Sequence, residues 1–315
     1  MRRYLVISPC RDEAEFIQFT IDSMAAQTQP PTTWLVVDDG SKDETPKILE
    51  AAAARYPFIR VVRREDRGKR SVGPGVIDAF YFGLSQVNLD DYDYVCKFDA
   101  DLEIPPRYFE RCMEHFEEDP WLGTLSGKLQ LKLGDKYVTE RIGDENSVGA
   151  AKFYRVACFK DIGGFVRGVC WDGIDGHMCR LKGWVARSID EPELRITHLR
   201  LMGSSDQNVW TGRVRWGRGK YFMGSAPYYV AAVALYRAIE RPFLLGGLGI
   251  LWGYVKAGLE RAPRMDDPAY LRQLRRFELE SLVLGKCRTV ARYNERIRRQ
   301  RPASHRAPGA KKASV

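Results

Sequence analysis

Short apolar runs alternate with helical patterns through the first hundred residues, and this alternation is the strongest constraint on the fold. The apolar runs are strand-like and have turn residues at their ends: 4–7, 33–37, 58–62 and 92–98. Helical patterns separate them at 13–27, 44–56 and 73–87. Strands that alternate with helices in this way predict an α/β fold, with a mostly parallel sheet flanked by helices.

Two of the predicted strands end directly at carboxylates. One apolar run precedes Asp38 and Asp39, and another precedes Asp99 and Asp101. Right-handed crossovers place the loops after parallel strands at one edge of the sheet, where ligands of open α/β folds bind. Two carboxylates at positions i and i+2 can converge on one hard cation. Asp99 and Asp101 are therefore predicted to present a divalent cation to a diphosphate, with a solvated acidic turn as the alternative.

The predicted cation is magnesium or manganese. Oxygen ligands suit these ions, and the sequence has no Cys/His cluster with the spacing of a zinc site. The seven cysteines include no Cys-x-x-Cys pair, and an odd number does not fit a disulfide framework. We therefore expect reduced thiols in a cytosolic protein.

The positive charge of the chain is concentrated near its C-terminus. The net charge is +9, and from Lys256 onward there are 16 Lys and Arg against 6 Asp and Glu. The preceding residues are therefore nearly neutral in sum. A basic tail on a neutral body suggests contact with an anionic surface, either a membrane or a nucleic acid. A solvated tail that only aids solubility is the alternative.

The longest uncharged run of the C-terminal third covers residues 242–255 and includes four glycines. Its fourteen residues are fewer than the roughly 18 to 20 that a membrane-spanning helix needs. Trp252, Tyr254 and Lys256 lie in or beside it, which is typical of an interfacial helix or a re-entrant hairpin. A buried core helix is the alternative.

The pattern of elements changes after Pro105 and Pro106, which can start a helix through residue 118. Strand-like stretches are expected at 123–133 and 137–142, followed by 149–159. A helix whose N-terminal end is rich in carboxylates is predicted at 172–181. An Arg/Trp/Gly-rich loop is expected at 208–219. The chain becomes apolar and helical from about residue 226.

Several segments within residues 4–220 together resemble the inverting family 2 glycosyltransferases. The segment 8–14 with 21–28 looks like the opening strand and helix of that family. The acidic turn at 36–45 is similar to its second acidic turn, and Asp99-Ala100-Asp101 matches its metal-binding pair. The resemblance implies a nucleotide-diphospho-sugar transferase fold of the A type, with a helical, basic C-terminal extension.

The resemblance also implies which residues bind the nucleotide sugar. A carboxylate of the second turn reads the nucleobase in this family, so Asp39 is the first choice and Asp38 the second. The loop 67–71 resembles a Gly-Lys segment whose cations contact the diphosphate or nearby acids, and a solvated turn is its alternative. The implied donor-binding residues are Ser8, Glu13, Asp38, Asp39, Lys69, Arg70 and Asp99. Asp99, Asp101 and His198 are the implied metal ligands, with a structural role as the alternative for His198.

The catalytic base of the family lies twelve positions before an aromatic residue that follows a glycine. Trp184 follows Gly183 here, so the resemblance implies Asp172 as the base. Asp175 is a rival, because this chain has Trp171 where an acid usually precedes the base. A third possibility is that both carboxylates only cap the helix.

Arg215 and Trp216 resemble the end of the Gln-x-x-Arg-Trp signature of processive polysaccharide synthases. Gly212 stands at the Gln position, and a multi-span membrane region is not evident in the sequence. Arg215 and Trp216 are therefore expected to contact the acceptor or the diphosphate rather than to indicate processive synthesis.

These observations predict a metal-dependent inverting glycosyltransferase that moves a sugar from a nucleotide-diphospho-sugar to a hydroxyl acceptor. The expected acceptor is a saccharide or lipid-linked saccharide of envelope or exopolysaccharide synthesis, and an anionic membrane surface is a further expected partner. We expect a cytoplasmic protein, peripheral at the inner face of the membrane, with no nucleic-acid partner. The expected parts are a catalytic domain at 1–220, a helical extension at 221–295 and a disordered basic tail at 296–315.

Two other classes of function remain as alternatives. A nucleotidyltransferase acting on a sugar phosphate also sets metal-binding acids over a parallel sheet, but residues 8–14 lack the glycine-rich loop that such enzymes carry. A non-catalytic protein that binds membranes or nucleic acid through its basic tail is the other alternative.

Overall fold

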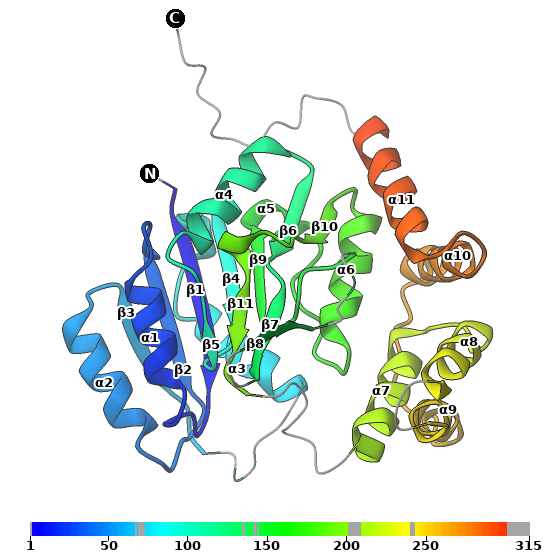
Figure 1. Ribbon diagram of the computed structural model, residues 1–315, viewed down its shortest axis with the longest axis horizontal. Coiled ribbons are helices and arrows are strands. Elements are labelled where there is room, and N and C mark those ends of the chain that lie inside the picture. Colours follow the sequence, from blue (N-terminus) through cyan, green and yellow to red (C-terminus); the bar gives the residue numbers. More distant parts are fainter. Residues whose placement is uncertain are drawn as a thin grey trace, which may run out of the picture.

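The computed structural model of the chain describes residues 2–66, 68, 73–133, 136–140, 143, 145–200, 209–239 and 243–300. A seven-stranded sheet with the order β10-β6-β9-β4-β1-β2-β3 forms its centre (Figure 1). Its strands are β1 (Tyr4–Cys10), β2 (Thr33–Asp38), β3 (Ile59–Arg63), β4 (Tyr94–Phe98), β6 (Leu122–Ser126), β9 (Ala151–Arg155) and β10 (Val185–Ser188). The pairs β1·β2, β2·β3, β1·β4 and β6·β10 are parallel, and β9 is antiparallel to β4 and β6. The predicted α/β class with a mostly parallel sheet is confirmed.

Helices cover both faces of this sheet, which explains why its central strands bury apolar side chains on both faces. Alternate residues of a strand point to opposite faces. In β1, Tyr4 and Val6 join one buried cluster, while Leu5 and Ile7 join the other. The first cluster packs on α1 (Ile17–Ala25), α2 (Thr45–Arg55) and α4 (Tyr108–Glu118). The second packs on α3 (Pro74–Leu84), α5 (Val156–Asp161) and α6 (Trp171–Leu181).

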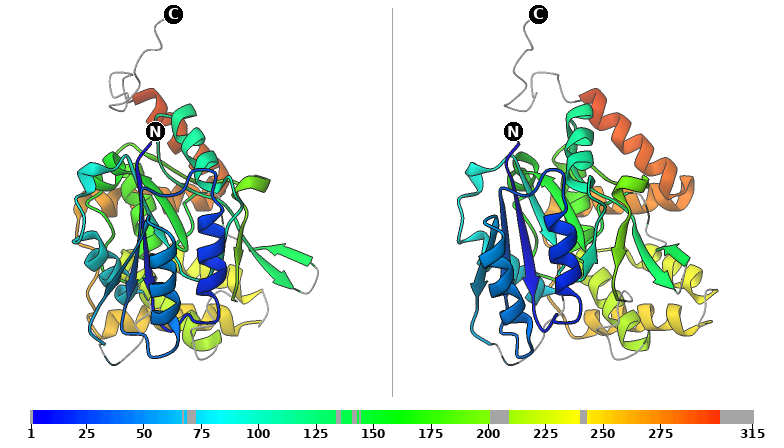
Figure 2. Two further views of the ribbon diagram at one scale, coloured as in Figure 1. Left: turned by 90° about the vertical axis from the view of Figure 1, so that its left-hand side faces the viewer. Right: turned by 60° about the vertical axis from the view of Figure 1, so that its left-hand side comes forward.

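A smaller four-stranded sheet lies at the carboxyl end of β4. Its order is β5 (Leu102–Glu103), β11 (Ile196–His198), β7 (Leu129–Leu133) and β8 (Lys136–Thr139). The β7–β8 hairpin projects from the body of the molecule (Figure 2). Strand β11 pairs antiparallel with β5, so that His198 lies opposite Leu102. This pairing brings His198 next to the carboxylates that follow β4.

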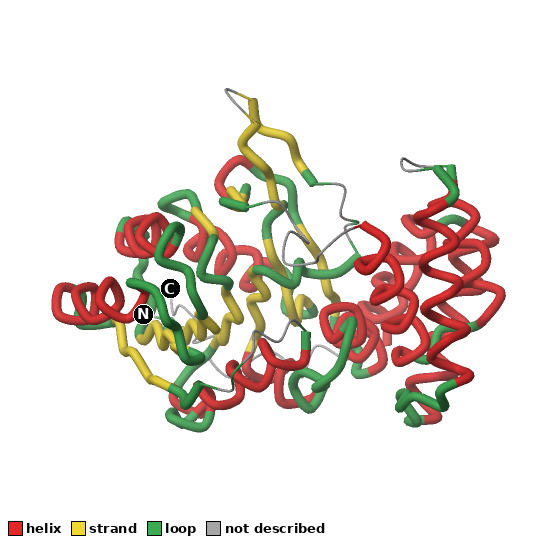
Figure 3. The backbone as a smooth tube through the Cα atoms, turned by 90° about the horizontal axis from the view of Figure 1, so that it is seen from below, coloured by secondary structure: helices red, strands yellow, loops and turns green. Residues whose placement is uncertain are grey.

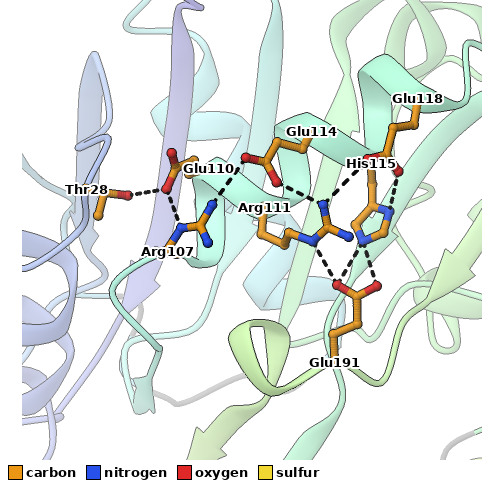
Figure 4. A network of polar contacts seen from close by, with 8 residues as sticks. All are labelled: Thr28, Arg107, Glu110, Arg111, Glu114, His115, Glu118 and Glu191. Atoms are coloured by element: carbon orange, nitrogen blue, oxygen red, sulfur yellow. Dashed lines mark hydrogen bonds and ion pairs between the residues drawn. The ribbon is translucent and has the colours of Figure 1, made fainter.

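A network of ion pairs fixes the segment that leads into β11 (Figure 4). The Glu191 carboxylate is 2.9 Å from Arg111 Nε and 3.1 Å from His115 Nε2, both on α4. Glu191 immediately precedes the 3₁₀ turn η2 (Pro192–Leu194); a second 3₁₀ turn, η1 (Leu89–Asp91), precedes β4. The same network continues along α4 through Arg107, Glu110, Glu114 and Glu118 to Thr28. These groups are partly exposed, so each pair adds little stability, but together they set where β11 begins.

The C-terminal part of the chain is helical. Its helices are α7 (Val209–Met223), α8 (Pro227–Ala238), α9 (Leu245–Leu259), α10 (Pro268–Leu284) and α11 (Lys286–Gln300). Helices α7, α8 and α9 lie together on the side of α6 that is away from β3 (Figure 1). Within the described residues, no helix is long and apolar enough to cross a membrane.

Two predictions for this part were wrong. Residues 209–219, expected as a loop, are the first three turns of α7, and residues 296–300, expected as disordered tail, belong to α11. Glycines in 209–219 suggested a loop because glycine disfavours helices. Tertiary packing overrides that preference, because a Cβ on Gly217 would lie 2.0 Å from the Ile250 carbonyl oxygen. Glycine is therefore required where α7 meets α9.

Small residues of α9 allow the same close approach from the other side. A Cβ on Gly253 would lie 2.0 Å from the Val214 carbonyl oxygen, and one on Gly247 would lie 2.3 Å from the Ala234 carbonyl oxygen. Helix α9 therefore packs backbone to backbone against α7 and α8, in the group of helices that Figure 3 shows from below.

Replacing Gly253 by alanine should destabilise the protein, whereas the same change at Gly258 of α9 should not. A Cβ at 253 collides with backbone, and overpacking of this kind costs about 1–3 kcal/mol. A Cβ at 258 would be 3.4 Å from the Tyr221 ring, an ordinary contact, and alanine improves helix propensity by up to about 1 kcal/mol. Urea unfolding followed by tryptophan fluorescence measures both. Equal stability of Gly253→Ala and Gly258→Ala would contradict the close approach.

Candidate active site

The turn after β2 is held in place by its own first carboxylate. Asp38 is buried, and its Oδ1 accepts a hydrogen bond from the Ser41 backbone N–H at 2.8 Å. Arg63 Nε lies 3.2 Å from Asp38 Oδ2. Gly40 has φ +81°, and a Cβ there would be 2.7 Å from the Asp66 Cα. Asp38 thus serves the turn itself, and the turn presents the next residue, Asp39, at the edge of the sheet.

Two arginines that the sequence analysis did not single out surround Asp39. Arg64 Nη1 is 3.0 Å from Asp39 Oδ1, and Arg11 Nη1 donates a hydrogen bond to the Asp39 carbonyl at 2.8 Å. Arg11 also pairs with Asp66 at 2.8 Å. The hydrogen bonds that Asp66 accepts from Lys42, the Gly68 backbone and Arg11 hold its pKa well below the usual range. Only the fold brings these groups together, because they follow three different strands.

Ser8, like Asp38, is buried in the structure. Its side chain is fully buried, and the hydroxyl accepts a hydrogen bond from Trp34 Nε1 at 2.9 Å. The Ser8 hydroxyl therefore lies in the core between β1 and β2 and is not exposed at the edge. Lys69 and Arg70 lie outside the described residues.

Arg200 connects the loop after β1 to the loop after β4. Its guanidinium pairs with the Glu13 carboxylate, and its Nε is 2.8 Å from Asp101 Oδ2. The guanidinium also lies over the Phe16 ring, 4.8 Å from the centroid. The sequence analysis missed Arg200, although its position two residues after His198 was a usable signal.

Asp99 and Asp101 lie close to basic groups at the carboxyl end of β4. Lys97 pairs with Asp99, and His198 Nε2 is 3.5 Å from Asp101 Oδ2. Burial acts to raise the pKa of Asp101, but His198 and Arg200 outweigh it, and the pKa lies below its usual value. Asp101 therefore carries its charge in this arrangement.

Glu140 is a further carboxylate of this cluster that the sequence analysis did not name. Its Oε1 lies 3.5 Å from His198 Nδ1 on the side away from Asp101. Neither Glu140 carboxylate oxygen has a hydrogen-bond donor within the described part of the chain, although both are buried. His198 thus lies between two carboxylates.

The donor set around β4 fits a magnesium or manganese ion by its chemistry. Asp99 and Asp101 offer carboxylate oxygens, His198 offers an imidazole, and the buried Glu140 oxygens lack donors. Over the residues that the structure describes, however, no three His, Cys, Asp or Glu side chains are arranged as a metal site. Lys97, His198 and Arg200 face the carboxylates instead, so a cation would have to exchange with these groups.

Asp172 lies beside this cluster, on the first turn of α6. Its side chain is exposed, and a Cβ on Gly149 would be 3.0 Å from Asp172 Oδ2. The Gly149 carbonyl accepts a hydrogen bond from Lys97 Nζ at 2.9 Å, and the same ammonium pairs with Asp99. The structure therefore brings Asp172 close to the β4 carboxylates through Gly149.

Asp175 occupies a different environment one turn further along α6. It is buried, its two oxygens are 2.8 and 2.6 Å from Lys152 Nζ, and it accepts a hydrogen bond from Tyr154. Burial raises the pKa of Asp175, and the Lys152 ammonium opposes that rise. Lys152 Nζ also donates a hydrogen bond to the Asp172 carbonyl at 2.8 Å. The Lys152–Asp175 pair thus anchors the turn that presents Asp172.

Arg215 and Trp216 lie on α7, and the structure separates their surroundings. The Trp216 ring packs in the α7–α8–α9 cluster with Arg213 and Arg237, whose guanidinium carbons are 5.3 and 5.2 Å from the ring centroid. Burial raises the pKa of the Cys170 thiol to about 12, and the charge of Arg215 opposes the rise. The charge of Arg215 therefore influences Cys170, which precedes α6. Trp216 instead contributes to the packing of the helices.

Comparison with known proteins finds a family match over the N-terminal part of the chain. A sequence model of the family described as glycosyl transferase family 2 matches residues 5–127, which include β1, β2 and β4 and the carboxylates after them. This segment of the chain therefore matches glycosyl transferase family 2. The predicted family is confirmed.

One curated relative and two solved structures show how far the likeness extends. The poly-beta-1,6-N-acetyl-D-glucosamine synthase of Staphylococcus aureus (strain COL) is 28% identical over 123 residues, which are 39% of this chain and 27% of that synthase. The S. aureus protein TarS 1–349, in complex with UDP-GlcNAc, has a TM-score of 0.52 and 15% identity, over 94% of this chain and 92% of that one. GalNAc-T7 with UDP, GalNAc and Mn2+ has a TM-score of 0.55 and 13% identity, over 89% and 58%. The two structures show the shared A-type glycosyltransferase fold.

The pH dependence of stability should reveal the position of His198 in protein freed of divalent metal. Burial acts to lower the His198 pKa, but Asp101 and Glu140 raise it from 6.5 to about 9. A raised pKa adds stability that is complete below pH 6.5 and is lost as the pH rises through the folded-state pKa. The free energy of unfolding of the wild type relative to His198→Gln should therefore fall by up to about 3 kcal/mol between about pH 6 and pH 10.

Urea unfolding of both proteins in the presence of a chelator measures this difference. The variant Glu103→Gln, which changes an exposed residue of β5 and keeps His198, serves as a control and should show the wild-type pH dependence. A difference between wild type and His198→Gln that stays constant with pH would contradict the charged histidine.

Proposed function

We propose that this chain is an inverting glycosyltransferase that moves a sugar from a nucleotide-diphospho-sugar to a hydroxyl group of a saccharide or lipid-linked saccharide. The observation that carries the proposal is the meeting of three acidic loops at one edge of the sheet. Arg200 links Glu13 to Asp101, and Lys97 links Asp99 to the backbone that contacts Asp172. The nucleotidyltransferase and the non-catalytic binder both lack support from the family match.

The nucleotide is assigned to the loops after β1 and β2. Asp39 lies at the edge of the sheet, and its carboxylate is the acceptor that would read the N–H edge of a uracil or guanine base. Arg11 and Arg64 hold the Asp39 backbone and side chain in a fixed orientation. The fully buried Asp38 keeps a supporting role in the turn. UDP-GlcNAc is the first donor to test, because the TarS 1–349 structure contains it.

Asp99, Asp101 and His198 are assigned to a magnesium or manganese ion. When bound there, a divalent cation supplies positive charge next to the departing diphosphate. The Arg200 guanidinium pairs with Glu13 and Asp101. If it were released from these carboxylates, it could pair with the phosphate oxygens of the donor instead. Lys97 orients Asp99 and the Gly149 carbonyl with the same ammonium group.

Asp172 is assigned as the general base. Its carboxylate accepts the proton of the acceptor hydroxyl while the hydroxyl oxygen forms a bond to the anomeric carbon. The bond from that carbon to the phosphate oxygen breaks on the opposite face, and its electron pair leaves with the nucleoside diphosphate. An α-linked donor therefore gives a β-linked product. Asp175 is the weaker candidate, because Lys152 and Tyr154 engage its carboxylate in the interior.

The acceptor and the division of the chain are part of the proposal. The synthase relative is named for a β-linked amino-sugar polymer, which supports a role in exopolysaccharide assembly. Residues 1–220 would form the catalytic domain, and α8 to α11 would form the extension. Arg215 is the residue of α7 assigned to the acceptor or diphosphate, since it lies near the start of α6.

Asp172→Asn should lower the turnover number for UDP release from UDP-GlcNAc by about 10² to 10⁴ and leave donor binding unchanged. An amide cannot take the proton, whereas the exposed position of Asp172 makes the change harmless to folding. Asp175→Asn is the matched comparison and should lower the unfolding midpoint, because it disturbs the buried Lys152 pair. Coupled detection of UDP, with water as the acceptor, measures turnover. Turnover of Asp172→Asn within a few-fold of wild type would assign the base elsewhere.

Asp101→Asn should weaken binding of Mn2+ in the presence of UDP by at least about tenfold, because it removes a charged oxygen ligand. Isothermal titration with MnCl2 and UDP measures the affinity independently of turnover. Glu103→Gln, two residues further along the chain and exposed, should bind Mn2+ as the wild type does. Unaltered Mn2+ affinity in Asp101→Asn, or UDP release that persists in a chelator, would contradict the metal assignment.

A further inference from the structure

Helix α9 buries most of its glycines and exposes most of its large apolar residues, the reverse of an ordinary surface helix. Gly246, Gly249, Gly253 and Ala257 are buried against the neighbouring helices. The opposite face is a stripe with spacings of three and four residues, and all its members are exposed and apolar: Leu245, Leu248, Trp252, Val255 and Leu259. A face of this kind is unfavourable in water.

The exposed apolar surface continues from α9 into its connection with α8. Phe243 and Leu244 precede α9 and are 61% and 64% exposed. Ile239 follows α8 and is 68% exposed, and Leu235 and Tyr236 lie within the last turn of α8. We call the exposed apolar side chains of 235–239 and 243–259 the hairpin patch. Most of the large apolar side chains exposed in the described part of the chain belong to it.

The charges around the hairpin patch are mainly positive. Residues 209–264 contain nine Lys and Arg against two Glu. Lys256 and Arg218 are 46% and 42% exposed, and both pair with Glu260 at the end of α9. Trp252 and Tyr236 add amphipathic rings of the kind found at the boundary between lipid and water. A second copy of this chain would bring the same positive charges to the interface, whereas an anionic lipid surface would complement them.

We propose that the α8–α9 hairpin docks on the surface of an anionic lipid bilayer and buries the hairpin patch among the acyl chains next to the headgroups. The hairpin enters one leaflet only, because neither helix has the length or hydropathy to cross. Arg218, Arg237 and Lys256 lie at headgroup level. Close packing of α7 against the backbone of α9 makes the three helices one rigid anchor.

Helix α7, on which α9 packs, contacts the start of α6. A Cβ on Gly219 of α7 would be 2.3 Å from the Cys170 Sγ, and one on Gly173 would be 2.8 Å from the Met223 Cε. Cys170 precedes α6 with φ +61°, two residues before Asp172. The anchor is therefore continuous with the turn that carries Asp172, and lipid contact fixes the orientation of that turn relative to the membrane.

Flotation of the full chain with lipid vesicles tests the proposal without any substrate. The wild type should float with vesicles of phosphatidylcholine and phosphatidylglycerol, and float at least about tenfold less with phosphatidylcholine alone. The triple variant L248S/W252S/V255S should remain with the unbound protein. These side chains are exposed, so its unfolding midpoint should match the wild type.

A matched control carries the same kind of change on another exposed surface. The variant L279S/L282S/V283S removes apolar side chains from α10 and should float as the wild type does. Asp172→Asn should also float, which separates lipid docking from the proposed chemistry. A wild-type protein that stays unbound, or a hairpin variant that floats equally well, would overturn the proposal. A wild-type dimer that does not float and becomes monomeric in the hairpin variant, by light scattering, would instead assign the patch to a second copy.

Discussion

Carboxylates crowd one edge of the parallel sheet, and basic side chains that enter from other elements balance their mutual repulsion. Lys97 of β4 pairs with Asp99. Arg200, which follows β11, pairs with both Asp101 and Glu13. Without these basic side chains, repulsion between the neighbouring carboxylates would favour their protonation or local unfolding. The carboxylates of this edge can therefore pair either with the basic side chains beside them or with a divalent cation that accompanies a diphosphate. The rest of the site depends on this balance.

A buried ion pair positions the remaining acidic group. Lys152 and Asp175 are both buried, and their attraction together with the Tyr154 hydrogen bond compensates for desolvation. The Lys152 ammonium also bonds to the carbonyl of Asp172, which leaves the Asp172 carboxylate exposed. A group that must collect a proton from an incoming hydroxyl has to remain accessible, whereas a group that only orients it can be buried. The exposed Asp172 and the buried Asp175 fit the roles that we propose for them.

The helical extension combines close packing with an unusual surface. Gly217 and Gly253 let α7 and α9 approach backbone to backbone, and the side chains that would ordinarily fill a helix interface point outward. The resulting apolar face lies in the helical, basic C-terminal part of the chain. The proposed lipid anchor is connected to the start of α6 where Gly219 of α7 meets Cys170.

The sequence by itself determined the strands, the helices between them and the position of the acidic turns, because hydrophobic periodicity and strand-end carboxylates are local patterns. It also singled out Asp172 through a resemblance, but left Asp175 as a rival. Only the tertiary structure decided between their environments, and only it brought Arg200 and Glu140 to the β4 edge. Contacts of this kind join residues far apart in the chain and leave no local pattern. The helix at 209–219 was unpredictable for the same reason, since the close approach of α9 outweighs the low helix propensity of glycine.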